Sequence, residues 1–237
     1  MKRPSRKLLP SNSCLRSLSA SVLTLAIVLF EVTGVAVWAG EPSRVRPLRT
    51  LSLDQVGRLF PSTTHLLLSP GAIEDFLDRL DRSPPDWASV YGTGHGDPGH
   101  DDRLFQLNRQ RDASRVGNET LHWRVAFVWA GELTDYDPKA AGFGVGIGPQ
   151  LTKTRWGVVR FKPEGLPGNL MAIPNPQVRK TLRRRFDRGE RIEVSLVMLG
   201  HLIPEESIVY DFSHDEEGVG MVMPVIQVER IEIIVEL

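Results

Sequence analysis

The chain has 237 residues, and its 29 basic and 29 acidic side chains give a formal charge of zero. Residues 1–39 carry five of the basic groups and one acidic group, so the part that follows holds 24 basic and 28 acidic residues. Nucleic-acid-binding domains normally have a clear basic excess, so this balance argues against nucleic acid as a partner.

The first 39 residues have the pattern of an export signal. A basic start precedes an uncharged, mainly apolar run over residues 18–30, and Val37-Trp38-Ala39 puts small residues at the outer positions of a cleavage site. The alternative is an uncleaved anchor, because residues 18–39 are long enough to span a bilayer, although Glu31 makes that costly. We expect cleavage and an exported, periplasmic protein, which meets the membrane only if residues 18–39 stay attached.

Cysteine chemistry is excluded from the exported part. The single cysteine, Cys14, precedes the apolar run, whereas a lipoprotein cysteine would follow it. Residues 40–237 can therefore hold no disulfide, thiolate metal site or cysteine nucleophile, and nothing in them indicates a cofactor. Stability must come from a hydrophobic core, for which this length suffices.

Residues 40–120 predict a small helical segment with a glycine-rich loop. Residues 41–50 are rich in proline and arginine and indicate a flexible lead-in. Ser52 and Gln55 then have the spacing of a capping box, which predicts a first short helix.

Two further helices are expected before residue 120. Ser69-Pro70 begins the clearer one, because serine is a good N-cap, proline fits the first turn, and apolar residues recur at steps of three and four. Glycines and prolines mark residues 86–102 as a loop, and either Asp101 or Asp102 is expected to cap the last helix.

The chain then changes to strand patterns. Residues 122–130 alternate with an aromatic face, and Gly131 allows a bend. Residues 142–148 have glycine at every second position. A third strand is expected over residues 154–162, followed by a proline-punctuated connection over residues 163–174.

One helix interrupts the strands. Asn175-Pro176 caps a predicted helix over residues 176–188, whose apolar stripe faces a core. Strands are predicted over residues 191–202, 207–212 and 221–237, and the apolar phase of the last one slips after Val228, which indicates a β-bulge.

This order of elements over residues 122–237 resembles exported bacterial domains of the OB-fold type, a small barrel with a helix before its fourth strand. The resemblance implies a mainly β fold with a five- to six-stranded barrel and a capping helix; a β-sandwich is the runner-up. The extra strand at residues 207–212 departs from the minimal pattern. The resemblance also implies a ligand face on the second and third strands, near Phe143, Trp156, Arg160 and Lys162.

Two segments concentrate histidine and carboxylate side chains, the ligands that suit zinc and similar metals. They lie within residues 95–102 and 211–217, and their spacing fits no ligand template, so we interpret both as solvated loops without a metal. If a metal binds, its candidate ligands are His95, Asp97, His100, Asp211 and His214. No serine stands in a Gly-x-Ser-x-Gly elbow, so a hydrolase of that type has no nucleophile.

The glycine ladder and the basic helix have simple interpretations. The ladder at residues 142–148 lacks the Gly-Lys-Ser/Thr of a phosphate loop, and we expect close packing against Trp129 or Trp156. The basic residues of the helix are interpreted as a solvated face, with Arg179 and Arg183 as its candidate contacts to an anionic ligand.

The expected function is therefore non-catalytic. Residues 1–39 form the signal, residues 40–120 the helical segment and residues 121–237 the barrel of a binding or accessory module of the cell envelope. Its partner would be an envelope protein or an anionic glycan. Two alternatives stay open: a metal-assisted hydrolase that uses one of the His/Asp segments, and a structural subunit anchored in the membrane.

Overall fold

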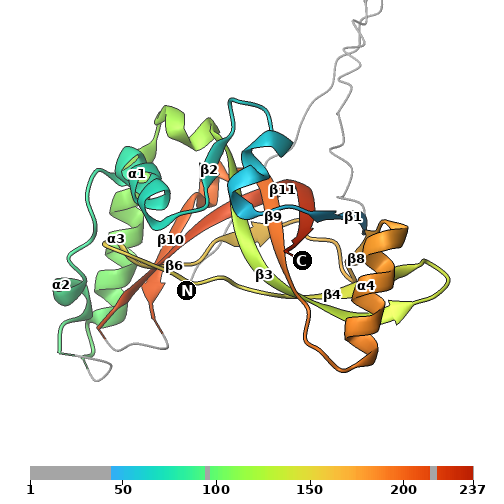
Figure 1. Ribbon diagram of the computed structural model, residues 1–237. Helices are drawn as coiled ribbons and strands as arrows, with labels where there is room; N and C mark the ends of the chain where they lie inside the picture. The colour runs from blue at the N-terminus through green and yellow to red at the C-terminus, as the bar shows by residue number, and fades with distance from the viewer. Residues whose placement is uncertain (1–43, 94–96, 214–217, 237) are drawn as a thin grey trace, which may run out of the picture. The chain divides into compact units, whose positions relative to one another are not determined.

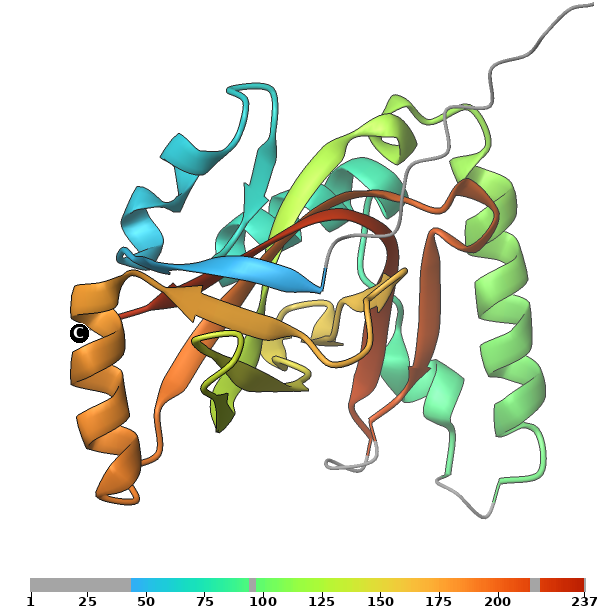
Figure 2. The same cartoon turned by 90° about the vertical axis from the view of Figure 1, so that its right-hand side faces the viewer.

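The computed structural model describes residues 44–93, 97–213 and 218–236. Six strands close a barrel in which each strand pairs with the next and the last pairs with the first (Figures 1 and 2). In barrel order they are β1 (Val45–Thr50), β8 (Met171–Pro174), β4 (Gly142–Gly148), β3 (Arg124–Asp137), β9 (Glu193–Leu202) and β11 (Gly220–Val235). The predicted fold class, a mainly β barrel with a capping helix and an N-terminal helical segment, is confirmed.

Strand β1 shows that a flexible lead-in over residues 41–50 is wrong for residues 45–50. The strand runs parallel to both β8 and β11, and Leu48 pairs with Pro174 on one side and Ile233 on the other. It thereby joins two strands of the barrel and gives their backbone groups partners. Leu48 is its only buried side chain, so the strand has no alternating apolar pattern that its sequence could reveal.

The long strands β3, β9 and β11 supply much of the core because their side chains alternate as predicted. Phe127 pairs with Met198, which pairs in turn with Ile231, and all three side chains are fully buried. The register of β11 shifts between Val228 and Arg230, which confirms the predicted bulge.

The predicted third barrel strand over residues 154–162 is wrong. That part of the chain forms three short strands: β5 (Thr152–Thr154), β6 (Gly157–Val159) and β7 (Lys162–Glu164). Gly157 has φ of +110°, which interrupts any continuous strand there. The third barrel strand is β8, inside the predicted connection 163–174, and its four residues are too few for a strand pattern to stand out.

Helix α4 (Pro176–Asp187) caps the barrel as predicted (Figure 1). The Asn175 side chain accepts a hydrogen bond from the Val178 backbone N–H at 2.9 Å, which fixes the first turn. Leu182 is fully buried, and the Phe186 ring packs against that of Phe143, with centroids 5.9 Å apart. The apolar stripe of the helix therefore seals the core.

The segment before β3 contains more structure than its sequence indicates. Its elements are η1 (Leu53–Leu59), β2 (His65–Leu67), α1 (Pro70–Asp81), α2 (Trp87–Tyr91), α3 (His100–Arg115) and η2 (Glu119–His122). Ser69 caps α1 as predicted, by accepting from the Ala72 N–H. Helix α2 lies inside the predicted loop 86–102, and Asp86 caps it.

The predicted cap of the third helix by Asp101 or Asp102 is wrong, because both lie in the first turn of α3. The Asp97 carboxylate accepts from the Gly99 N–H at 2.9 Å and holds the turn that leads into the helix. An Asx turn two residues upstream thus replaces the expected cap.

Strand β10 (Ile208–Phe212) is the predicted extra strand, and it pairs with the first half of β11; η3 (Pro204–Glu206) precedes it. Its other edge is covered by α3. The Asn108 amide donates to the Tyr210 carbonyl at 2.9 Å and accepts from the Tyr210 N–H at 2.8 Å. One side chain therefore satisfies both backbone groups of an edge-strand residue.

A buried ion pair ties the helices to this strand. Arg115 donates two hydrogen bonds to the Asp81 carboxylate, at 2.7 and 2.6 Å, and the Tyr210 hydroxyl donates to the same carboxylate. Burial and then the Asp81 charge raise the pKa of Tyr210 well above its usual value.

The predicted close packing of the β4 glycines is found at Gly142 and Gly144, but the partners are not Trp129 or Trp156. A Cβ on Gly144 would lie 2.5 Å from the Thr134 hydroxyl, and one on Gly142 would lie 2.4 Å from Ile173, whereas Gly148 has nothing within 4 Å. Side chains of the flanking strands therefore fill the space at the start of β4, and the end of the strand stays open.

Candidate functional site

The structure brings three of the predicted ligand residues together around Tyr136. The Arg183 guanidinium lies 4.3 Å from the centroid of the Tyr136 ring, and Phe143 packs on the same ring at 5.0 Å. Arg179 donates to the nearby Ala141 carbonyl at 3.3 Å. Because Phe143 is fully buried, its ring supports this cluster from the core and offers no stacking surface.

The other three predicted residues do not lie on the third barrel strand. The Trp156 side chain is fully buried and donates to the Asp78 carboxylate at 3.1 Å. Lys162 pairs with Glu164 at 3.1 Å, and Arg160 follows β6. The resemblance implied that these three residues lie on the third barrel strand. This placement is wrong, because residues 154–162 form short strands instead of that barrel strand.

The two His/Asp segments approach each other at one point. The His100 ring stacks on Phe212 with centroids 5.0 Å apart, next to Asp211, whose carboxylate accepts from the Phe212 N–H. His95 and His214 lie outside the described residues. Within the residues that are described, no three histidine or carboxylate groups gather in a way that could hold a metal.

Asp97 is engaged by its own neighbours. Its carboxylate accepts from Arg103 at 2.8 Å and from the backbone N–H groups of Gly99 and Thr93. These hydrogen bonds, that from Arg103 first, hold the pKa of Asp97 well below its usual range. The carboxylate thus has a structural task.

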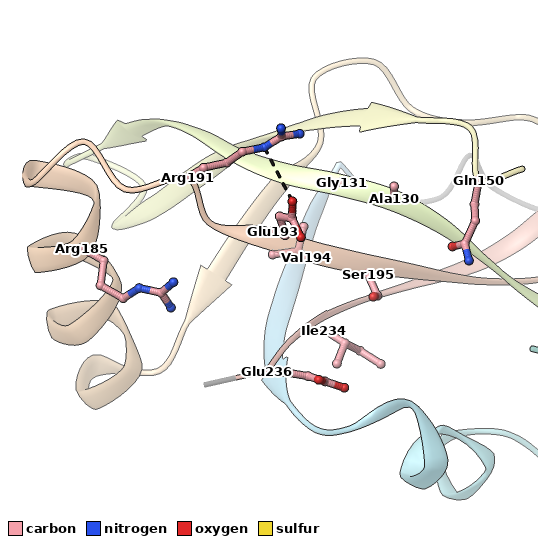
Figure 3. A pocket seen from close by; sticks show the side chains of 10 residues that line it. All are labelled: Ala130, Gly131, Gln150, Arg185, Arg191, Glu193, Val194, Ser195, Ile234 and Glu236. Carbon is pink, nitrogen blue, oxygen red and sulfur yellow. Dashed lines mark ion pairs between the residues drawn. The ribbon is translucent and has the colours of Figure 1, made fainter.

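A groove on the outer wall of the barrel is the better candidate site (Figure 3). We call it the barrel groove; its cavity measures about 520 Å³. Its lining residues are Ala130, Gly131, Gln150, Arg185, Arg191, Glu193, Val194, Ser195, Ile234 and Glu236.

The floor of the barrel groove is a row of cross-strand partners. Ala130 pairs with Ser195, and Ser195 with Ile234, so one lining position on each of β3, β9 and β11 lies on the same outward face. Ala130 and Ser195 are small. The backbone of the sheet can therefore be approached closely along a line that crosses two inter-strand steps of about 4.8 Å each.

The rim of the barrel groove carries both signs of charge. Arg191 pairs with Glu132 at 2.8 Å and lies 3.9 Å from Glu193, as the dashed line in Figure 3 marks. Arg185 donates to Glu190 at 2.9 Å, and this hydrogen bond is the main reason why the pKa of Glu190 is lowered. Each guanidinium is already paired with a carboxylate, so the rim offers directed hydrogen bonds more than net charge.

Unused hydrogen-bonding groups lie between the charged residues. Over the described part of the chain, the Ser195 hydroxyl and the Gln150 amide form no hydrogen bond, so both can bind a ligand. Sequence reasoning missed the groove because its floor combines three strands. The one available signal was the glycine ladder, whose last member, Gly148, pairs with Ala130 of the floor.

Comparison with known proteins gives no relative: no family model, no curated protein and no solved structure matches this chain. None of the helices in the described ranges is long and apolar enough to cross a bilayer.

Proposed function

We propose that the protein is an exported, non-catalytic binding module of the cell envelope, and that its barrel groove holds an extended segment of a partner protein. The observation that carries the proposal is the row of Ala130, Ser195 and Ile234 across β3, β9 and β11. Export and the envelope are proposed from the pattern of residues 1–39.

The chemistry of the groove favours a polypeptide over a glycan. None of its lining residues is aromatic, so it offers no ring on which a sugar could stack. Two inter-strand steps of about 4.8 Å match about three residues of extended chain. The balanced rim suits a segment that carries both acidic and basic side chains.

Site-specific photo-crosslinking tests this proposal. A photoreactive amino acid at Gln150, at the exposed end of the groove, should give a discrete adduct in the native host. The same adduct should disappear when Ser195→Trp fills the floor in the same chain, because the indole occupies the line where the segment would lie.

The control carries the photoreactive residue at Lys139, which is exposed in the turn between β3 and β4. An adduct that also forms from position 139, or that persists in the Ser195→Trp variant, contradicts binding in the groove. Thermal unfolding of each variant checks that the fold is kept.

Export has its own test. Mass spectrometry of the envelope fraction should find an N-terminus at Gly40. An intact residue 1 in that fraction would instead favour the membrane-anchored structural subunit.

A metal-assisted hydrolase remains the second candidate, because the His100–Phe212 stack brings the two His/Asp segments together. Elemental analysis of the purified protein decides it. Stoichiometric zinc or calcium that is lost on replacing His100 with alanine would support this function, and a metal-free protein would remove it.

A further inference from the structure

A second cavity, of about 740 Å³, lies where α1 and α3 end, away from the barrel groove. Its polar lining is rich in hydrogen-bond donors, with Arg82 and Ser83 after α1 and Arg111 and Ser114 on α3. A cavity of this size accommodates a sugar-sized ligand, not only a small ion.

The one carboxylate in the lining is already neutralised. Both oxygens of Asp81 accept from Arg115, and the Tyr210 hydroxyl also donates to one of them. Within the described ranges, neither Arg82 nor Arg111 pairs with a carboxylate. Both arginines thus line the cavity without a paired carboxylate, and the Arg111 guanidinium lies over the Trp156 and Tyr210 rings, 5.9 Å from each centroid.

Capping of α1 does not explain these arginines. The Arg82 backbone N–H donates to the Asp78 carbonyl, and the Asn118 amide donates to those of Arg79 and Leu80. The Arg111 Nη1 donates to the Asp81 carbonyl at 2.7 Å. All four terminal carbonyls of the helix are thus satisfied without the Arg82 side chain, and Arg111 keeps further N–H groups for a ligand.

Arg82 also has a backbone conformation that disfavours it. Its φ is +65°, in the region where glycine is the usual residue at the end of a helix. Strained positions of this kind concentrate at functional sites. The strained residue is exposed and adds an arginine side chain to the cavity lining, which a glycine would not supply.

We infer that this cavity is an oxyanion site that binds the carboxylate or sulfate group of an acidic glycan. Arg82 and the remaining N–H groups of Arg111 hold the anion, and the hydroxyls of Ser83 and Ser114 hydrogen-bond the sugar. Guanidinium groups suit this task because their donors match the oxygens of such anions in pairs.

Isothermal titration calorimetry of the purified full chain tests the inference. The ligands are inorganic sulfate, a sulfated oligosaccharide, an oligouronate and a neutral oligosaccharide of equal length. One of the acidic oligosaccharides should bind and the neutral one should not; which of the two binds distinguishes sulfate from carboxylate.

The Arg82→Gly variant gives the sharpest result, because binding and stability should change in opposite directions. Its affinity for the acidic glycan should fall at least tenfold, while its Tm rises by about 2–4 °C as the backbone strain is relieved. Arg82→Lys should keep part of the affinity. Arg184→Gln, which removes an exposed arginine of α4, is the control for charge and should leave the affinity unchanged.

Three outcomes would overturn the inference. The first is that no acidic oligosaccharide binds at millimolar concentration. The second is that Arg82→Gly binds as tightly as the unmodified protein or weakens no more than Arg184→Gln does. The third is a lower Tm in Arg82→Gly, because the arginine would then be a structural cap.

Discussion

Replacing Arg115 with methionine should destabilise the protein strongly, because it leaves a buried charge without its partner. The side chains of Arg115 and Asp81 are 2 % and 0 % exposed. After the change, the hydrogen bond from Tyr210 is the one that the Asp81 carboxylate keeps among the described residues. Asp112, which also pairs with Arg115, is half exposed and is rehydrated at little cost.

The expected loss follows from the burial of the pair. Removing one partner of a fully buried ion pair typically costs about 3–5 kcal/mol. In a domain of this size, 1 kcal/mol shifts Tm by about 2–4 °C, so Tm should fall by roughly 6–20 °C. The double variant Asp81→Leu/Arg115→Met removes both charges and should cost much less, about 0–2 kcal/mol.

Urea unfolding of the two variants and the unmodified protein measures this difference. The midpoint should fall sharply for Arg115→Met and recover in the double variant, with the slope of unfolding free energy against urea unchanged. The reasoning is refuted if Arg115→Met lies within about 1 kcal/mol of the unmodified protein, or if the double variant is the less stable of the two.

Three further predictions concern the sheet that packs against the helices. Gly220→Ala should destabilise the protein by about 1–3 kcal/mol or more, because its Cβ would lie within 2.1 Å of the Trp87 indole. Gly148→Ala is the control and should be tolerated, because its Cβ would have nothing within 4 Å. The Tm values of the two alanine variants measure the difference. Asn108→Leu should lower the free energy of unfolding by about 2–4 kcal/mol, because both backbone groups of Tyr210 lose their hydrogen-bond partner. Hydrogen exchange of the Tyr210 amide should become faster. An unchanged exchange rate would show that Asn108 does not protect the edge of β10. Because the pKa of Tyr210 is raised in the folded state, its contribution to stability is fully present below about pH 10 and is lost as the pH rises further, so alkaline unfolding should come later in Tyr210→Phe. Comparing the ultraviolet titration of this variant with that of the unmodified protein should show that Tyr210 ionises only when the protein unfolds.

The predicted elements that proved correct are those with a long, continuous pattern. Helix α4 has a cap, a proline in its first turn and a full apolar stripe, and the structure confirms all three. Strands β9 and β11 are long, with ten and sixteen residues, and rich in apolar side chains. The bulge after Val228 was visible because the apolar phase changes within one strand.

The errors are concentrated where an element is short or owes its place to another part of the chain. Strand β8 has four residues, and β1 buries one side chain. Glycine and proline in residues 86–102 correctly indicated irregular structure, yet a five-residue helix fits inside it. Local propensity cannot identify such elements, because pairing and packing supply most of their stability.

The candidate sites were less predictable than the fold. The composition of α4 correctly indicated a helix that carries many arginines. It did not show that Asp187 and Glu190 pair with some of these arginines and neutralise their charge. The barrel groove and the Arg82 cavity both arise from contacts between distant segments. In neither place do neighbouring residues form a motif.

The sequence alone determined the absence of cysteine chemistry in residues 40–237 and the order of the long strands and the capping helix, because each depends on neighbouring residues. The tertiary structure decided how β1 closes the barrel, which three residues make the groove floor, and which charges are neutralised. Asp81 meets Tyr210 across 129 positions, and Asn108 meets it across 102. Contacts at such separations depend on how the whole chain packs, and no local pattern encodes them.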